Sequence, residues 1–156
     1  MTPLPTHKYI PGQTARHPED RFDAMRSLAL LPTKTATASQ NPPWLYGIRL
    51  FETGVYWEAH EVWEPVWLNA RPNSTERFIC QAVIQISNAA LKRDMGKSRA
   101  AERLCTMAEG LLKQSTLAGR VPPMGLENAI TKAAIAQIRQ DVANGWKSAL
   151  SLNDAL

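Results

Sequence analysis

The chain has 156 residues, enough for one domain with its own hydrophobic core. Hydrophobic residues make up 44% of it and charged residues 21%, which is typical of soluble globular proteins. No apolar run approaches the length of a bilayer span, and residues 1–16 lack the apolar core of a secretory signal. We therefore expect a cytoplasmic protein with no membrane partner.

The net charge of +4 is unevenly distributed along the chain. Residues 41–70 contain four glutamates and a single base, whereas residues 71–156 contain twelve bases and seven acids. The bases between Lys92 and Arg103 form a cluster, but no aromatic residues interleave with them and the usual nucleic-acid-binding motifs are absent. We expect nucleic acid not to be a partner.

Apolar residues recur at spacings of three and four, and alternating β-branched runs are absent. This pattern predicts an all-α fold, a compact bundle of about six helices whose short connections favour antiparallel neighbours. Residues 1–16 are polar and are expected to form a flexible N-terminal arm, followed by a single helical domain at 17–156.

Residues that typically start or end helices divide this domain into six expected helices. Pro18 suits a first helical position, Gly54 and Gly96 suit helix ends, and Asn73 with Glu76 resembles a capping box. The expected helices span residues 18–31, 43–53, 55–70, 73–95, 98–117 and 126–150. Cys80 and Cys105 have apolar neighbours in two of them, so we expect buried free thiols.

The helix expected at 55–70 carries the candidate site. Most of its aromatic and aliphatic side chains fall within one arc of a helical wheel, so packing in the core explains them. His60 lies at the edge of that arc, with Glu64 one turn beyond and Glu61 further round. Glu58 lies almost opposite His60 and cannot join the same small site.

Three interpretations of His60, Glu61 and Glu64 remain open. In the first, His60 is half buried, is paired by Glu64 or by a neighbouring helix, and serves the fold. In the second, the three residues bind a divalent metal ion, although the second histidine of the HExxH metalloprotease pattern is absent. In the third, His60 or Glu61 acts as a general acid or base, but no nucleophile partner is visible, so the sequence does not decide whether the chain is an enzyme.

The helix expected at 73–95 supplies a facing polar stripe. The stripe consists of Gln81, Gln85, Asn88 and Lys92, which are four, three and four residues apart. These side chains face either the His60 region or water. If they face His60, the predicted pocket places Gln81 and Gln85 opposite the three ligands. The full set of expected ligand-binding residues is His60, Glu61, Glu64, Gln81, Gln85, Tyr56 and Trp67.

The same residues carry a resemblance. The segment FETGVYWEAHEVWEPVW resembles the F-N-x-G-x-Y-x-E-A-H-E-x-x-E-x-x-W signature of domain-of-unknown-function family 309, a set of small all-helical proteins. The resemblance covers about residues 44–112. Glu52 stands where that family usually has asparagine, and Ala82 stands where glycine is usual. The resemblance implies a compact helical fold and no established activity.

Two functions follow as hypotheses. The first is binding of a small ligand or a divalent metal ion at the His/Glu pocket. The alternative is a module for protein–protein interaction or self-association, without catalytic activity, that uses tryptophan-rich surfaces or the last helix. An exposed apolar patch of several hundred Å² would favour this alternative.

Overall fold

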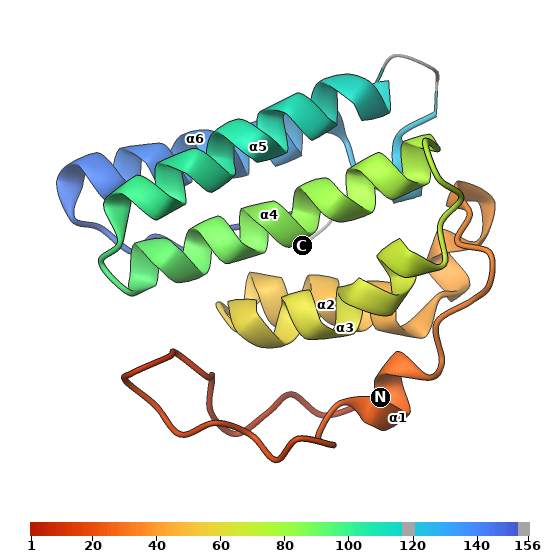
Figure 1. The fold of residues 1–156 in the computed structure, drawn as a ribbon, viewed down its shortest axis with the longest axis horizontal. Coiled ribbons are helices and arrows are strands. Elements are labelled where there is room, and N and C mark those ends of the chain that lie inside the picture. The colour runs from red at the N-terminus through yellow and green to blue at the C-terminus, as the bar shows by residue number, and fades with distance from the viewer. Residues whose placement is uncertain (117–120, 153–156) are drawn as a thin grey trace.

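The computed structural model describes residues 1–116 and 121–152, and within them it contains helices and no strand (Figure 1). The all-α prediction is confirmed. Three short elements are α1 (Asp23–Arg26) and the 3-10 turns η1 (Thr35–Gln40) and η2 (Pro123–Gly125). The long helices are α2 (Pro42–Glu52), α3 (Tyr56–Leu68), α4 (Thr75–Asp94), α5 (Ser98–Thr116) and α6 (Asn128–Asn144).

Helix α4 is the centre of the bundle. It packs against α3 on one side and against α5 and α6 on the other, and α2 packs against α3 (Figure 1). Twelve of its twenty residues are buried, as expected for a helix covered on most of its circumference. The largest buried side chains of the core include Trp44, Leu50, Phe51, Trp63, Ile79, Ile86, Leu112 and Ile138.

Gly47 allows α2 and α3 to approach closely. A Cβ atom at Gly47 would lie 2.1 Å from Nε1 of Trp63, so no larger residue fits without moving the indole. Trp63 Nε1 also donates a hydrogen bond to the Trp44 carbonyl at 3.1 Å. The indole is thereby fixed across α2, and its buried N–H is satisfied.

Two predicted helices are shorter than expected. The helix predicted at 18–31 is reduced to Asp23–Arg26, and Leu28 and Leu31 beyond its end are exposed. The helix predicted at 126–150 ends at Asn144, because Gly145 adopts the left-handed conformation that ends many helices. The predicted end of the fifth helix, Leu117, lies outside the described residues.

The start of α4 also differs from the capping prediction by one residue. Ser74, not Asn73, is the N-cap, and its hydroxyl oxygen accepts a hydrogen bond from the Arg77 backbone N–H at 3.1 Å. Glu76 accepts a hydrogen bond from the backbone N–H of Thr35 at 3.0 Å instead of closing a capping box. This bond ties the start of α4 to η1.

Residues 1–16 lie along α2 and α3 (Figure 1). The Tyr46 hydroxyl donates to the Pro3 carbonyl at 2.8 Å, and Tyr9 packs on Trp57 with ring centroids 5.0 Å apart. Ile10 is buried in the core. Whether these residues behave as a flexible arm beside a domain at 17–156 stays a prediction.

None of the helices in the described part of the chain combines the length and the apolar character needed to cross a membrane.

Candidate metal or ligand site

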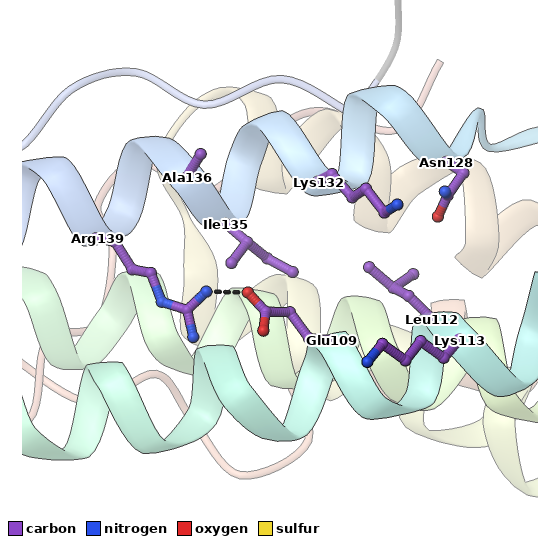
Figure 2. A pocket seen from close by; sticks show the side chains of 8 residues that line it. All are labelled: Glu109, Leu112, Lys113, Asn128, Lys132, Ile135, Ala136 and Arg139. Carbon is purple, nitrogen blue, oxygen red and sulfur yellow. Dashed lines mark hydrogen bonds and ion pairs between the residues drawn. The ribbon is translucent and has the colours of Figure 1, made fainter.

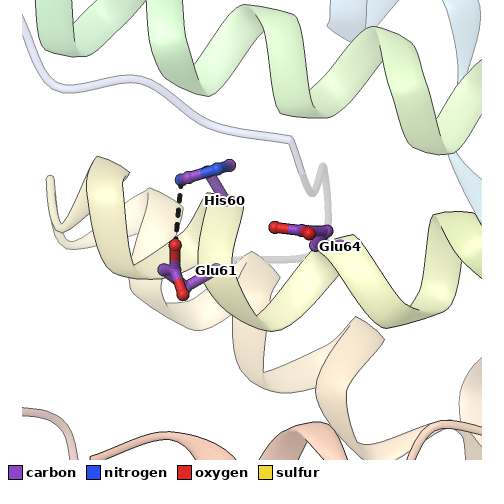
Figure 3. A group of neighbouring side chains, drawn as sticks. All are labelled: His60, Glu61 and Glu64. Carbon is purple, nitrogen blue, oxygen red and sulfur yellow. Dashed lines mark ion pairs between the residues drawn. The ribbon is translucent and has the colours of Figure 1, made fainter. Parts of the chain in front are cut away.

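Helix α3 brings His60, Glu61 and Glu64 together (Figure 3). One potential ligand atom from each residue lies within 4.8 Å of the other two, and each side chain is partly exposed. Within residues 1–116 and 121–152, this is the one group of three or more such residues with that spacing. The set matches the most compact constellation expected from the helical wheel.

The His60 ring is held in one orientation. Its Nδ1 lies 3.1 Å from the Trp57 carbonyl oxygen, and because a carbonyl only accepts, Nδ1 carries the proton of this bond. Nε2 of the neutral ring then keeps a free lone pair. A backbone carbonyl that fixes the tautomer in this way is a common partner of metal-binding histidines.

Arg26 from α1 is the counter-ion of the two glutamates. Its guanidinium lies 4.0 Å from Glu61 and 3.9 Å from Glu64, which is too long for direct hydrogen bonds. Its Nε is enclosed and has no hydrogen-bond partner among the residues that the structure describes. The sequence did not indicate this contact, because Arg26 precedes Glu61 by a long stretch of chain without a recognisable motif.

The other four predicted pocket residues have contacts outside this cluster, and a pocket that they share with His60 stays a prediction. Tyr56 lies in the core against Phe51, and its hydroxyl accepts a hydrogen bond from Arg93 at 3.3 Å. Trp67 is half buried beneath Arg77, whose guanidinium lies 4.8 Å from the ring centroid. Gln81 lines a shallow groove shared with Met107 and Leu111 of α5. Gln85 is half buried on the same face of α4. Among the described residues, no hydrogen bond joins either glutamine to the three ligands.

Glu58 lies on the other side of α3, as expected, and it has a role that the sequence did not reveal. It is fully buried, and Oε2 accepts hydrogen bonds from the Tyr9 backbone N–H at 2.7 Å and from His17 Nε2 at 2.6 Å. Both donors precede α1. Glu58 therefore anchors the N-terminal segment to the bundle.

A second polar cluster lies around Arg93 of α4. Arg93 is buried and contacts Asp141 of α6 at 2.7 Å and Asp94 at 3.0 Å. Arg93 belongs to the basic cluster noted in the sequence, but its charge is enclosed and paired. Burial alone raises the pKa of Asp141, yet hydrogen bonds from Gln137 and Ser148, together with the charge of Arg93, outweigh it and lower the pKa.

The middle of the chain is similar to a family of protein domains. Residues 44–104 match the model of DUF309, a domain of unknown function. The match confirms the resemblance for α2, α3, α4 and the first part of α5. Among curated proteins and among solved structures, none matches the chain.

All seven predicted site residues lie within the matched segment, whereas Arg26, His17 and Asp141 lie outside it. The segment thus contributes the imidazole and both carboxylates of the cluster. The segments before and after it contribute the counter-ion Arg26 and the partners of Glu58 and Arg93. An imidazole nitrogen with two carboxylate oxygens is a donor set suited to first-row divalent metals.

Proposed function

We propose that the protein is a cytoplasmic metal-binding protein whose divalent ion is held by His60, Glu61 and Glu64. The observation that carries this proposal is that one donor atom from each residue lies within 4.8 Å of the other two on an accessible surface. The free Nε2 of His60 supports it, because the backbone carbonyl of Trp57 already takes the Nδ1 proton.

Three protein ligands leave coordination positions open. Structural zinc sites use four protein ligands, whereas sites with three keep a position for water or a small molecule. The proposed ion would therefore also account for the small-ligand hypothesis, since a ligand could bind the open position. Imidazole favours zinc and its neighbours over magnesium, which prefers oxygen ligands and retains its water.

Isothermal titration calorimetry tests this proposal directly. Zn²⁺ and Mn²⁺ should bind saturably to the wild type and Mg²⁺ should bind more weakly, whereas His60→Ala and Glu64→Gln should lose Zn²⁺ binding. His7→Ala is the matched control, because His7 is exposed and lies far from Glu61 in the sequence. Zn²⁺ binding that is unchanged in His60→Ala would contradict the proposal.

A second candidate function is self-association. Leu28, Leu31 and Leu68 are exposed, and the side chain of Asn69 donates to the Leu30 carbonyl at 3.0 Å, which brings their segments together. Exposed apolar side chains on two neighbouring segments would suit an interaction surface if they form a contiguous patch. Sedimentation velocity over a wide concentration range should then show an oligomer that Leu31→Glu dissociates, whereas a monomer at every concentration would contradict self-association.

A further inference from the structure

A cavity of about 340 Å³ opens between α5 and α6 (Figure 2). None of its lining residues belongs to the His60 cluster. Leu112 and Ile135 form an apolar floor, and both side chains are buried. Ala136 is exposed at the opening. A concave, mostly apolar cavity of this size with a few polar groups at its edge is typical of small-molecule sites.

The edge of the cavity is positively charged. Lys113 of α5 and Lys132 of α6 lie on its two sides (Figure 2). The one carboxylate in the lining, Glu109, is bound to Arg139, which also contacts Glu102 at 2.6 Å. The lining holds three basic side chains, Lys113, Lys132 and Arg139, and the one carboxylate of Glu109, so a ligand meets a net positive charge.

Asn128 closes one end of the cavity. Its side-chain oxygen is enclosed and has no hydrogen-bond partner in the described structure. Asn128 is also the first residue of α6, the end of a helix that carries a partial positive charge. The charge of this helix end adds to that of Lys132.

We propose that this cavity binds a small organic carboxylate with an apolar tail. The tail would cover Leu112 and Ile135, and the carboxylate would bind Lys132 near the start of α6. An ammonium group binds a carboxylate through a charge-assisted hydrogen bond, which is strengthened where water is partly excluded. The cavity would then be a binding site independent of the His60 cluster.

Decanoate is a suitable probe, and decanol has the same tail without the charge. Calorimetry on the full chain should show saturable decanoate binding that is about tenfold weaker in Lys132→Glu, the effect of one lost charge-assisted contact. Ala136→Trp should abolish binding by filling the opening, and because position 136 is exposed the fold should be retained. Lys97→Glu, at an exposed position between α4 and α5, should bind decanoate like the wild type.

Three results would overturn the proposal: no saturable binding of decanoate, equal binding by Ala136→Trp and the wild type, or equal affinity for decanol and decanoate. His60→Ala should bind decanoate normally. A loss of decanoate binding in that variant would show that the two sites are not independent and would overturn the assignment to the cavity between α5 and α6.

Discussion

The charged cluster around Arg93 of α4 and the charged cluster around His60 of α3 differ in how their charges are paired. Around Arg93, the ion pairs are 2.7–3.0 Å long and both partner carboxylates are at most 5% exposed. Around His60, the ion pairs are 3.9–4.0 Å long, and Glu64 is 39% exposed. The first cluster has every charge satisfied by the protein, whereas the second keeps donor atoms available for a ligand.

This difference suggests that the Arg93 cluster stabilises the fold, whereas the His60 cluster is suited to binding a metal ion. A buried ion pair costs free energy to desolvate, and removing one partner leaves the other charge buried and unpaired. An exposed and loosely held pair contributes little to stability and is easily exchanged for another cation. We therefore expect substitutions around Arg93 to change folding and substitutions around His60 to change metal binding.

The largest effect is expected for Asp141→Ala. Among the described residues, the change leaves Arg93 with Asp94 as its one carboxylate partner. It also removes the acceptor of the Ser148 backbone N–H, which lies 2.9 Å from Asp141. Unfolding in urea should show a loss of about 3 kcal/mol, the lower end of the range for a broken buried pair. Asp23→Ala, at an exposed position in α1, is the control. Equal stability of the two variants would contradict a structural role for this cluster.

The pH dependence of stability gives an independent test of the same cluster. Because the pKa of Asp141 is lowered in the folded state, its contribution is present above the ordinary aspartate value of 3.8 and is lost as the pH falls through the folded pKa. The difference in unfolding free energy between wild type and Asp141→Asn should therefore shrink on acidification below about pH 4. A difference that does not vary between pH 2 and 7, about the range over which carboxylates titrate, would contradict this account.

Glu58→Ala should have the next largest effect. It removes the acceptor of Tyr9 and His17, so the N-terminal segment loses its anchor on α3. We expect a loss of about 2 kcal/mol in unfolding free energy, as for other buried acceptors that leave donors unsatisfied. Trypsin should also cleave after Arg16 faster than in the wild type. Unchanged cleavage, together with wild-type behaviour of the exposed control Glu19→Ala, would show that Glu58 is not the anchor.

Arg26→Gln should strengthen metal binding at the His60 cluster. Arg26 is the positive charge that a metal ion must displace from Glu61 and Glu64. Removing it should increase Zn²⁺ affinity by up to about fivefold, which corresponds to about 1 kcal/mol, the upper value for an exposed ion pair. Arg21→Gln removes an equal charge from a neighbouring exposed position and should have less effect. Weaker Zn²⁺ binding in Arg26→Gln would indicate that Arg26 supports the site rather than competing for it.

The smallest expected effect is that of His60→Ala on folding. The side chain is 25% exposed and makes one hydrogen bond, to the Trp57 carbonyl in its own helix. The unfolding free energy should change by less than about 1 kcal/mol, as for most partly exposed substitutions. Thermal unfolding with and without Zn²⁺ measures this change. A loss as large as that of Asp141→Ala would mean that His60 serves the fold.

Local patterns in the sequence were sufficient to predict most of the long helices and the pairing of His60 with Glu64. Periodicity placed α2 to α5 closely, and helix geometry alone brought His60 near Glu64, since both depend on residues a few positions apart. The contacts of Arg26 and His17 with α3 were not predictable, because they join segments far apart in the chain. The orientation of Gln81 toward α5 was not predictable for the same reason, because it depends on how three helices pack.

The most direct test of metal binding is elemental mass spectrometry of protein purified without a histidine tag, comparing wild type, His60→Ala and the His7→Ala control. We predict a near-stoichiometric divalent metal in wild type and His7→Ala, and its loss in a His60→Ala protein that remains folded. Equal metal content in all three proteins, or no metal in wild type even after incubation with Zn²⁺, would contradict the assignment of His60, Glu61 and Glu64 as a metal site.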